Sequence, residues 1–285
     1  MAPSGPRRAL AMAAGGMNGV SAATHAPRQD AWLLRLIATA LAFGLFGLGG
    51  LFLRLVVFPA QRLLIANPAR RHRRSRAVIT WTFYRFVRLL VRMGVLTYEF
   101  RGVERLGRPH QMIVANHPSL LDVVFLVAHV PHANCVVKHS LVKNPFTAGP
   151  IRNAGYISND ESMDMLERAA QVLRDGETLI VFPEGTRTPV DAPPRFHRGA
   201  CAIAIRGARV VTPVVITMNT RSLTKGEPWY RIPHRRMHYV FEVGADIDPE
   251  QWTRRHPAPI AGRRMNDHLH HYYRTELGLD GTAGK

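Results

Sequence analysis

The stretch LIATALAFGLFGLGGLFL, residues 36–53, holds 18 residues without a charge between Arg35 and Arg54. As an α-helix it would be ~27 Å long, close to the ~30 Å hydrocarbon core of a bilayer. A signal peptide has a shorter apolar region and a small-residue cleavage site, whereas arginines follow this stretch. We therefore predict a transmembrane or membrane-embedded helix over residues 31–60. The alternatives are a shallow hairpin within residues 36–58 and a buried core helix.

The flanks of this helix differ in character. Residues 1–30 are rich in Ala, Gly and Pro and lack a periodic pattern, so we expect a disordered leader. The segment ANPARRHRRSR (66–76) is strongly basic, which places it and the remainder of the chain on the cytoplasmic side of an inner membrane. Aromatic bulk and recurring arginines in residues 77–95 fit a helix in the headgroup region. We thus assign residues 61–95 to a basic amphipathic interfacial segment; an ordinary packing helix is the alternative.

The chain has 285 residues and a formal net charge of +18. Such an excess favours anionic partners, and anionic membrane lipids account for it without a nucleic acid. Cys135 and Cys201 are too few for a disulfide framework and show no metal-ligand spacing, so we expect buried thiols in a reducing compartment. We predict no metal site and no bound cofactor.

Residues 96–275 alternate between strand-like and helix-like segments, and residues 276–285 read as a disordered tail. This alternation is typical of an α/β fold with a mixed, largely parallel sheet flanked by helices. The expected strands are MIVAN (112–116), NCVVK (134–138), GYIS (155–158), TLIVF (178–182), VVTPVVIT (210–217) and HYVFEVG (238–244). The expected helices are residues 118–130, 161–176 and 199–208.

Polar residues follow the first of these strands in the sequence NHPSLLD. We expect Pro118 to begin a helix, with Asn116 and His117 at its mouth. Asp122 then leans back toward His117, and a carboxylate on one ring nitrogen makes the other a general base. The structural alternative is a His–Asp pair that fastens the helix to the strand.

A second polar turn, FPEGTRT (182–188), follows another buried strand. After Pro183, Gly185 permits a tight turn, and Arg187 offers a planar fork for phosphate. Glu184 and Thr186 lie in the same turn. Because both motifs end strands, we expect a base and an anion-binding group near one edge of the sheet.

These motifs resemble those of the glycerolipid acyltransferases, the family of bacterial lysophosphatidate acyltransferases. NHPSLLD (116–122) matches its NHxxxxD motif, FPEGTRT (182–188) its FPEGTR block, and FHRG (196–199) the block that follows. The VVTPVVI segment around Pro213 resembles a later block. A further block is matched through Lys138, Leu141, Pro145, Gly149, Gly155 and Ile157. Ordered blocks cover about residues 95–220.

The resemblance implies a membrane-bound O-acyltransferase that moves an acyl chain from an acyl-CoA or acyl-carrier-protein thioester to a lysophospholipid hydroxyl. His117 would take the hydroxyl proton and Asp122 would orient His117. Arg187 and Lys138 would bind an anionic headgroup or the phosphates of the donor. Glu184, with Gly185 and Thr186 beside it, would shape the motif or contact an acceptor hydroxyl.

One departure from the family pattern leaves the acceptor open. An arginine usually closes the second block, but Ser158, Asn159, Asp160 and Glu161 stand there in this chain. Lysophosphatidate is the first acceptor considered, and a lyso-aminolipid or another specialised lipid alcohol is the alternative. A non-catalytic membrane-binding scaffold is a possibility from another class, and it would not require His117 or Asp122.

Overall fold

The computed structural model describes residues 31–144, 146–160, 162–189 and 193–279. The predicted leader (residues 1–30), most of the predicted tail, Pro145 and Glu161 lie outside the described residues.

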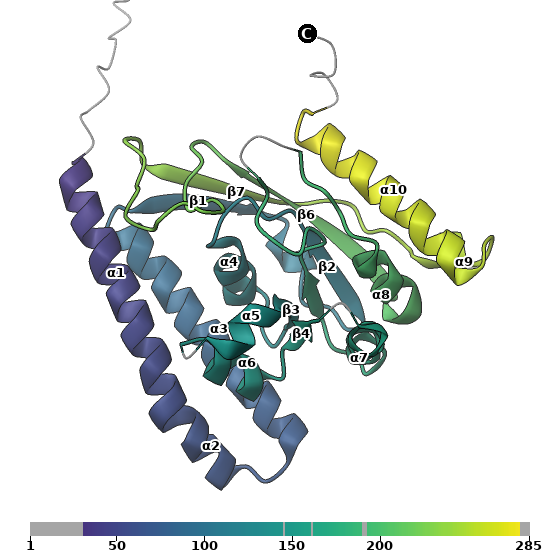
Figure 1. The fold of residues 1–285 in the computed structure, drawn as a ribbon, viewed down its shortest axis with the longest axis horizontal. Helices are drawn as coiled ribbons and strands as arrows, with labels where there is room; N and C mark the ends of the chain where they lie inside the picture. The colour runs from purple at the N-terminus through teal and green to yellow at the C-terminus, as the bar shows by residue number, and fades with distance from the viewer. Residues whose placement is uncertain (1–30, 145, 161, 190–192, 280–285) are drawn as a thin grey trace, which may run out of the picture. The chain divides into compact units, whose positions relative to one another are not determined.

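A seven-stranded sheet forms the centre of the fold, in the order β1-β7-β6-β2-β5-β3-β4 (Figure 1). All neighbouring strands are parallel except β6 and β7, which are antiparallel. The prediction of a mixed, largely parallel sheet flanked by helices is therefore confirmed. The strands are β1 (Leu96–Arg101), β2 (Gln111–Ala115), β3 (Asn134–Lys138), β4 (Ile157–Asn159), β5 (Leu179–Val181), β6 (Val210–Met218) and β7 (Met237–Val243).

Strand β2 is buried at every position, because helices cover both faces of the sheet. Its side chains alternate between two separate cores, as the two-residue repeat of a strand requires. Ile113 and Ala115 belong to the core that includes Phe125 of α4 (Asp122–His129). Met112 and Val114 belong to the core that includes Leu173 of α7 (Met163–Arg174).

The remaining helices divide between these two cores. Helix α3 (Pro68–Arg92) packs with α4, whereas α8 (Gly199–Gly207) packs with α7 and α10 (Ala258–Glu276). Shorter elements are α5 (His139–Lys143), α6 (Ala148–Ala154), α9 (Glu250–Thr253) and a 3₁₀ turn at Val103–Arg105. Strand β1 and helix α10 were not among the elements expected from the sequence.

The predicted apolar helix extends further than its uncharged run. Helix α1 (Trp32–Phe52) continues through a π-helical turn (Leu53–Val57) into α2 (Phe58–Leu64). These 33 residues are long and apolar enough to cross a membrane, and only 22% of the most apolar window is buried. Its buried positions in α1 are Arg35, Ala38, Thr39 and Ala42.

Helix α3 has features of both alternatives given for this segment, an ordinary packing helix and an interfacial helix. Ile79, Phe86, Val87 and Leu90 are buried in the core, as in an ordinary packing helix. The outward side retains arginine over aromatic pairs, with Arg85 above Trp81 at 5.6 Å and Arg88 above Tyr84 at 5.8 Å. The assignment of this segment to the membrane interface stays a prediction.

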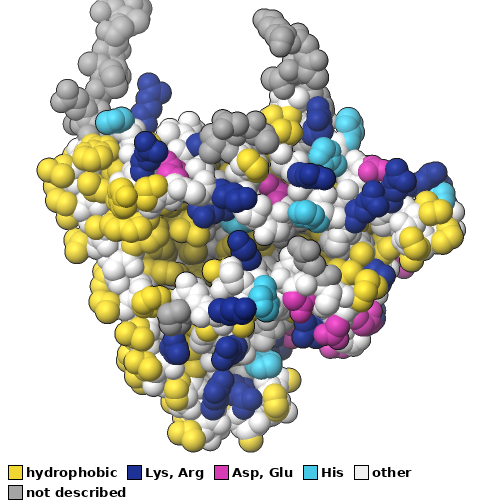
Figure 2. All heavy atoms as spheres, viewed as in Figure 1, with side chains coloured by type: hydrophobic (Ala, Val, Ile, Leu, Met, Phe, Trp, Pro, Cys, Tyr) yellow, Lys and Arg dark blue, Asp and Glu magenta, His cyan; other side chains and the backbone are white. Residues whose placement is uncertain are grey.

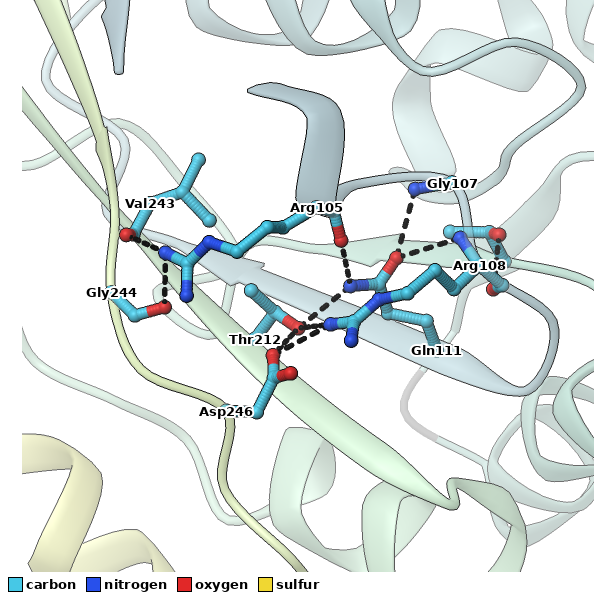
Figure 3. Close-up of polar contacts among 9 residues, drawn as sticks. Arg105, Gly107, Arg108, Gln111, Thr212, Val243, Gly244 and Asp246 are labelled. Atoms are coloured by element: carbon cyan, nitrogen blue, oxygen red, sulfur yellow. Dashed lines mark hydrogen bonds and ion pairs between the residues drawn. The ribbon is translucent and has the colours of Figure 1, made fainter. Parts of the chain in front are cut away.

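The edge of the sheet where β2 begins carries a polar network (Figure 3). The side chain of Gln111 donates to Thr212 Oγ1 (2.7 Å), and Thr212 donates to Asp246 (2.7 Å). Arg108 forms an ion pair with Asp246 at 2.6 Å, and Arg105 donates to the Gly244 carbonyl (2.9 Å). This network joins the start of β2 to β6 and to the segment after β7. It lies at the opposite end of β2 from the NHPSLLD motif.

Candidate active site

The two polar motifs emerge side by side from neighbouring parallel strands. Strand β2 pairs with β5 through Val114 and Val181, so NHPSLLD and FPEGTRT begin at the same edge of the sheet. The carboxyl ends of parallel strands are the usual place for binding sites in such folds. Close contact between the motifs follows from strand order, as the sequence predicts.

Asn116 fixes the start of the first motif by extending the pairing of β2 with β6. Its amide Nδ2 donates to the Ile216 carbonyl (2.9 Å), and the Ile216 N–H donates to Asn116 Oδ1 (2.7 Å). The side chain thus replaces a backbone partner and is buried. This anchor sets the position of the next residue, His117.

His117 and Asp122 form a pair at the head of α4. The two atoms His117 Nδ1 and Asp122 Oδ2 are 2.9 Å apart, with the Asp122 side chain fully buried and that of His117 15% exposed. His117 Nε2 has no hydrogen-bond partner among the described residues. A neutral histidine held in this way presents Nε2 as a proton acceptor.

The helix does not begin where the sequence predicts. Pro118 is not its first residue, because α4 begins at Asp122. The intervening turn is held by the Ser119 N–H, which donates to Asp122 Oδ2 (2.7 Å). Ser119 Oγ lies 2.9 Å from the Tyr239 hydroxyl. The spacing Ser-x-x-Asp is half of a capping box and was the signal for this arrangement.

Opposing effects act on the pKa of the buried Asp122 carboxyl. Burial raises the pKa of Asp122, while the hydrogen bond from His117, the charges of His117 and Arg187 and the Ser119 N–H oppose that rise. Its other oxygen, Oδ1, is buried without a partner in the described part of the chain. The carboxyl is thus oriented almost wholly by His117 and the turn before α4.

Glu184 joins the second motif to the first. Its Oε1 accepts the His117 backbone N–H (2.8 Å) and the Thr188 hydroxyl (2.9 Å), and the Thr188 N–H donates to the His117 carbonyl (2.7 Å). Burial raises the pKa of Glu184, opposed by those two hydrogen bonds. Glu184 therefore binds the His117 backbone, away from the imidazole Nδ1 that Asp122 holds.

Arg187 is oriented by backbone carbonyls. Its Nη1 donates to the Leu223 carbonyl (2.9 Å) and the Thr224 carbonyl (2.8 Å). No other hydrogen-bond partner of this guanidinium is found in the part of the chain that the structure describes. Nε and Nη2 are therefore available to an anion close to Asp122, whose carboxyl Arg187 already influences.

A cavity of about 530 Å³ lies beside the FPEGTRT turn, and neither His117 nor Asp122 is among its lining residues. Glu184, Gly185 and Thr186 line it, and the Phe182 ring forms part of its wall. The same Phe182 ring lies 4.4 Å from the His117 ring between centroids. Gly185 has φ +63°, a left-handed conformation that favours glycine. Phe182 was not singled out from the sequence, because an aromatic residue at a strand end reads as core.

The Acyltransferase family model matches residues 97–217. These residues contain every motif described above. The chain carries an acyltransferase domain. The resemblance to the glycerolipid acyltransferases is thereby confirmed, and with it the prediction of an acyltransferase.

Two relatives and one solved structure illustrate this similarity. The 1-acyl-sn-glycerol-3-phosphate acyltransferase of Pseudomonas aeruginosa is 26% identical over 195 residues, 58% of this chain and 75% of that protein. The lyso-ornithine lipid O-acyltransferase of the same organism is 29% identical over 128 residues, 44% of this chain and 49% of that protein. The crystal structure of the 1-acyl-sn-glycerophosphate acyltransferase PlsC from Thermotoga maritima matches with a TM-score of 0.62 and 21% identity, covering 89% of this chain and 98% of that one. The last likeness supports the fold of the domain.

Lys138 stands apart from the His–Asp pair of the acyltransferase domain. It ends β3 at the same sheet edge, is exposed and makes no side-chain hydrogen bond with the described residues. Where the family arginine is missing, Ser158 Oγ lies 3.0 Å from His139 Nδ1, and Asn159 lines the cavity. Asp160 forms a loose ion pair with Arg168 at 3.7 Å. None of these side chains supplies a cation to the cavity.

Three other motif residues of the acyltransferase domain, Gly155, Pro183 and Pro213, have roles in the backbone structure. Gly155 ends α6 with φ +68°, and a Cβ there would lie 2.8 Å from His72 Nδ1. The Pro183 carbonyl accepts the His197 N–H (2.8 Å), and the Pro213 carbonyl accepts the Gly244 N–H (2.9 Å). Their role as site residues stays a prediction.

The two cysteines and the histidines of α10 lie outside the candidate site. Cys135 and Cys201 are both buried, and burial raises the pKa of each to about 12, so both stay neutral thiols at neutral pH. Within the described ranges, no group of three or more His, Cys, Asp or Glu side chains is placed to hold a metal ion. His268 and His271 are exposed on α10.

Proposed function

We propose that this protein is a membrane-bound O-acyltransferase that converts lysophosphatidate to phosphatidate. The acyl donor is a thioester, acyl-CoA or acyl carrier protein, which serves as co-substrate, and no bound cofactor or metal takes part. The observation that carries the proposal is the 2.9 Å contact of His117 Nδ1 with a fully buried Asp122, which leaves Nε2 without a partner among the described residues. Similarity to the 1-acyl-sn-glycerol-3-phosphate acyltransferases supports the choice of substrate.

The proposed reaction begins with the acceptor hydroxyl at His117 Nε2. The hydroxyl proton passes to Nε2 while its oxygen forms a bond to the thioester carbonyl carbon. Collapse of the tetrahedral intermediate breaks the carbon–sulfur bond, and the imidazolium returns its proton to the leaving thiolate. General-base assistance of this kind contributes about 10²- to 10⁴-fold to the rate.

Asp122 and Arg187 support this step in different ways. Asp122 holds the proton-bearing Nδ1 and stabilises the imidazolium, as its contact and its burial favour. Arg187 binds an anionic headgroup or a donor phosphate through the N–H groups that the Leu223 and Thr224 carbonyls leave unused. Lys138 acts as a second, more distant cation at the sheet edge. Glu184 holds the His117 backbone in place.

The proposed membrane-contacting surface, which we call the membrane seat of α1, is the exposed face of the N-terminal helix. Its buried positions in α1 contact the protein, and the opposite side is apolar and exposed, so the helix is embedded with one face toward lipid. The arginines of residues 70–76 support a position of the acyltransferase domain on the cytoplasmic side of an inner membrane. An embedded enzyme meets its lysolipid acceptor by lateral diffusion, while the soluble donor arrives from the cytoplasm.

A second acceptor class is favoured by one specific observation. The second block offers Ser158, Asn159 and Asp160 where the family has an arginine, and none is cationic. A lyso-aminolipid acceptor needs less positive charge at that position. Similarity to a lyso-ornithine lipid O-acyltransferase supports this alternative.

The test is a transfer assay with purified protein in detergent or vesicles. Labelled acyl-CoA and acyl-carrier-protein thioester are each offered with lysophosphatidate, lyso-ornithine lipid and neutral lysolipids. We expect labelled phosphatidate from the wild type and about 10²- to 10⁴-fold less from His117→Ala. Histidine-dependent acylation of the aminolipid alone would replace the acceptor and retain the chemistry. Equal activity of both proteins would overturn the role of His117 as the base. No transfer with any pair would overturn the proposal in favour of a lipid-binding scaffold.

A further inference from the structure

The loop between β6 and β7, residues 219–236, is the longest connection that the motifs do not explain. One of its ends contacts the active site. The Leu223 carbonyl accepts Arg187 Nη1 (2.9 Å) and also the backbone N–H of Leu120 (3.1 Å), two residues before Asp122. Leu223 adopts φ +56°, which is uncommon for a residue other than glycine and is maintained by these contacts.

The other end of the same loop is bound to the N-terminal helix. Buried Arg35 of α1 donates to the Pro233 carbonyl (3.0 Å) and the His234 carbonyl (2.5 Å). Trp32 Nε1 donates to the Ile232 carbonyl (3.3 Å). The loop is therefore hydrogen-bonded to Arg187 near one end and to α1 near the other.

The outer surface of the loop has the composition of a lipid interface. Trp229 is 42% and Tyr230 59% exposed, although both are large aromatic side chains. Exposed basic side chains lie around them: Lys225, Arg231 and Arg235. Tryptophan and tyrosine gather at the membrane–water boundary, and basic side chains attract anionic headgroups.

Trp229 of the loop also packs against α1. Trp229 stacks on Phe43 with ring centroids 6.0 Å apart and planes inclined by 22°. The exposed apolar side chains on α1 include Leu33, Leu34, Ile37, Leu41 and Leu45. Figure 2 shows hydrophobic side chains gathered on the side of the molecule where α1 lies in Figure 1. Trp229 therefore lies against α1, whose exposed side chains are apolar.

We infer that the β6–β7 loop is a second membrane contact, with Trp229 and Tyr230 in the headgroup layer of an anionic bilayer beside α1. This inference rests on the proposed seat of α1 in the membrane. Charge complementarity with Lys225, Arg231 and Arg235 and the contact of Trp229 with α1 select lipid as the occupant. Because the same loop holds Arg187, contact with lipid and orientation of the anion-binding group are joined in one segment.

The experiment uses the burial of both native cysteines, which lets an introduced surface thiol be labelled selectively. Full-length Tyr230→Cys, Leu45→Cys and Gln251→Cys proteins are labelled with a polarity-sensitive fluorophore and reconstituted into vesicles of phosphatidylglycerol and phosphatidylcholine. Leu45 reports on the α1 face, and Gln251 on exposed α9. Lipid-borne spin labels and aqueous iodide then compete as quenchers. Acyl transfer by each labelled protein verifies its fold, with Arg231→Cys as a second loop position.

We expect the label at residue 230 to be quenched several-fold more by shallow lipid-borne spin labels than the label at residue 251, and to be protected from iodide. Lipid quenching at residue 45 with iodide quenching at residue 230 would overturn the inference while the membrane seat of α1 stands. Iodide quenching at both positions would overturn both. Protection of residue 230 from both quenchers would assign the loop to a second copy of the chain and likewise overturn the inference.

A charge test gives an independent measurement. Replacing Lys225, Arg231 and Arg235 by Gln should weaken binding to phosphatidylglycerol vesicles about fivefold for each charge removed. The same variant should bind phosphatidylcholine vesicles like the wild type. Equal loss on both vesicle types would contradict a charge-selective lipid contact.

Discussion

Asn116 pairs with the backbone of Ile216 through two hydrogen bonds, one from its amide nitrogen and one to its amide oxygen. A side chain thus continues the β2–β6 pairing for one residue beyond the strand, directly before His117. The asparagine of the NHPSLLD sequence thereby sets where the candidate base stands.

Asn116→Ala should therefore lower both stability and activity. The substitution leaves the buried Ile216 N–H and carbonyl without partners, at about 1–3 kcal/mol for each group. We expect a lower free energy of unfolding in a denaturant titration and a reduced kcat. Thr217→Ala, at an exposed neighbour on β6, is the matched control and should change neither. An unchanged unfolding free energy in Asn116→Ala would contradict the anchoring role.

Asp122→Asn should separate activity from stability. The amide cannot stabilise an imidazolium, so kcat should fall about 10²- to 10⁴-fold with little change in KM. Burial raises the pKa of Asp122, so removing its charge relieves a desolvation cost, and the melting temperature should stay level or rise. Combined with His117→Ala, the two losses should not add, because the residues act as a unit. Additive losses would show independent roles.

Glu184→Gln should change the pH dependence of stability. Burial raises the pKa of Glu184, so the folded state keeps its proton above the pH at which the unfolded chain loses it. The contribution of Glu184 to stability is then greatest at acidic pH and declines as pH rises through that window. Glutamine preserves the acceptor oxygen but cannot ionise, so melting temperatures should favour the variant increasingly toward neutral pH. A difference that is constant with pH would refute this.

Asp246→Asn should change the pH dependence of stability in the opposite direction to Glu184→Gln. The hydrogen bond from Arg108 holds the pKa of Asp246 below its usual range. Its contribution is present above the pKa of the unfolded carboxyl and is lost as pH falls through the folded-state pKa. Since both side chains are partly exposed, we expect only about 0.5–1 kcal/mol at neutral pH. The loss should shrink in acid and in high salt, while catalysis at the far sheet edge stays unchanged.

Gly207→Ala should destabilise the packing of α7 with α8. A Cβ at residue 207 would lie 2.3 Å from the Ala170 carbonyl oxygen, a backbone atom that cannot turn aside. We expect a loss of about 1–3 kcal/mol in unfolding free energy. Gly262→Ala is the control, since its Cβ would meet only the end of Ile205 at 3.4 Å. Similar losses in both variants would show that the backbone contact is not the cause.

The sequence pattern predicted the sheet and the positions of the motifs. It did not predict elements whose apolar pattern is weak, such as β1 and α10. The alternation of apolar segments predicted the sheet, and motifs at strand ends predicted that the two polar turns lie near each other. Strand β1 was missed because it lies at the edge of the sheet, and its burial pattern includes exposed Glu99 and Arg101. Helix α10 was missed because its polar face, including three histidines, conceals the buried stripe.

The details of the site followed less well from the chain. A proline at the first helical position is a local preference, but the turn before α4 is set by Ser119, whose hydroxyl meets Tyr239 at a separation of 120 residues. The partners of Arg187 were likewise inaccessible, because backbone carbonyls at Leu223 and Thr224 carry no sequence signature. Residue type predicted a phosphate fork there, and only the fold shows which of its N–H groups are already used.

Strand β2 lies between β5 and β6 and is buried throughout, so His117 extends from the most interior strand of the sheet. Local opening of a protein begins at weakly packed edges and spreads inward only at higher free energy. The outermost strands of the sheet, β1 and β4, can therefore open and close without disturbing the strand that leads to the candidate base. Hydrogen exchange at the amides of Ile113 and Val114 should then require unfolding of the whole domain. The strand that leads to the His–Asp pair should therefore open only when the domain unfolds.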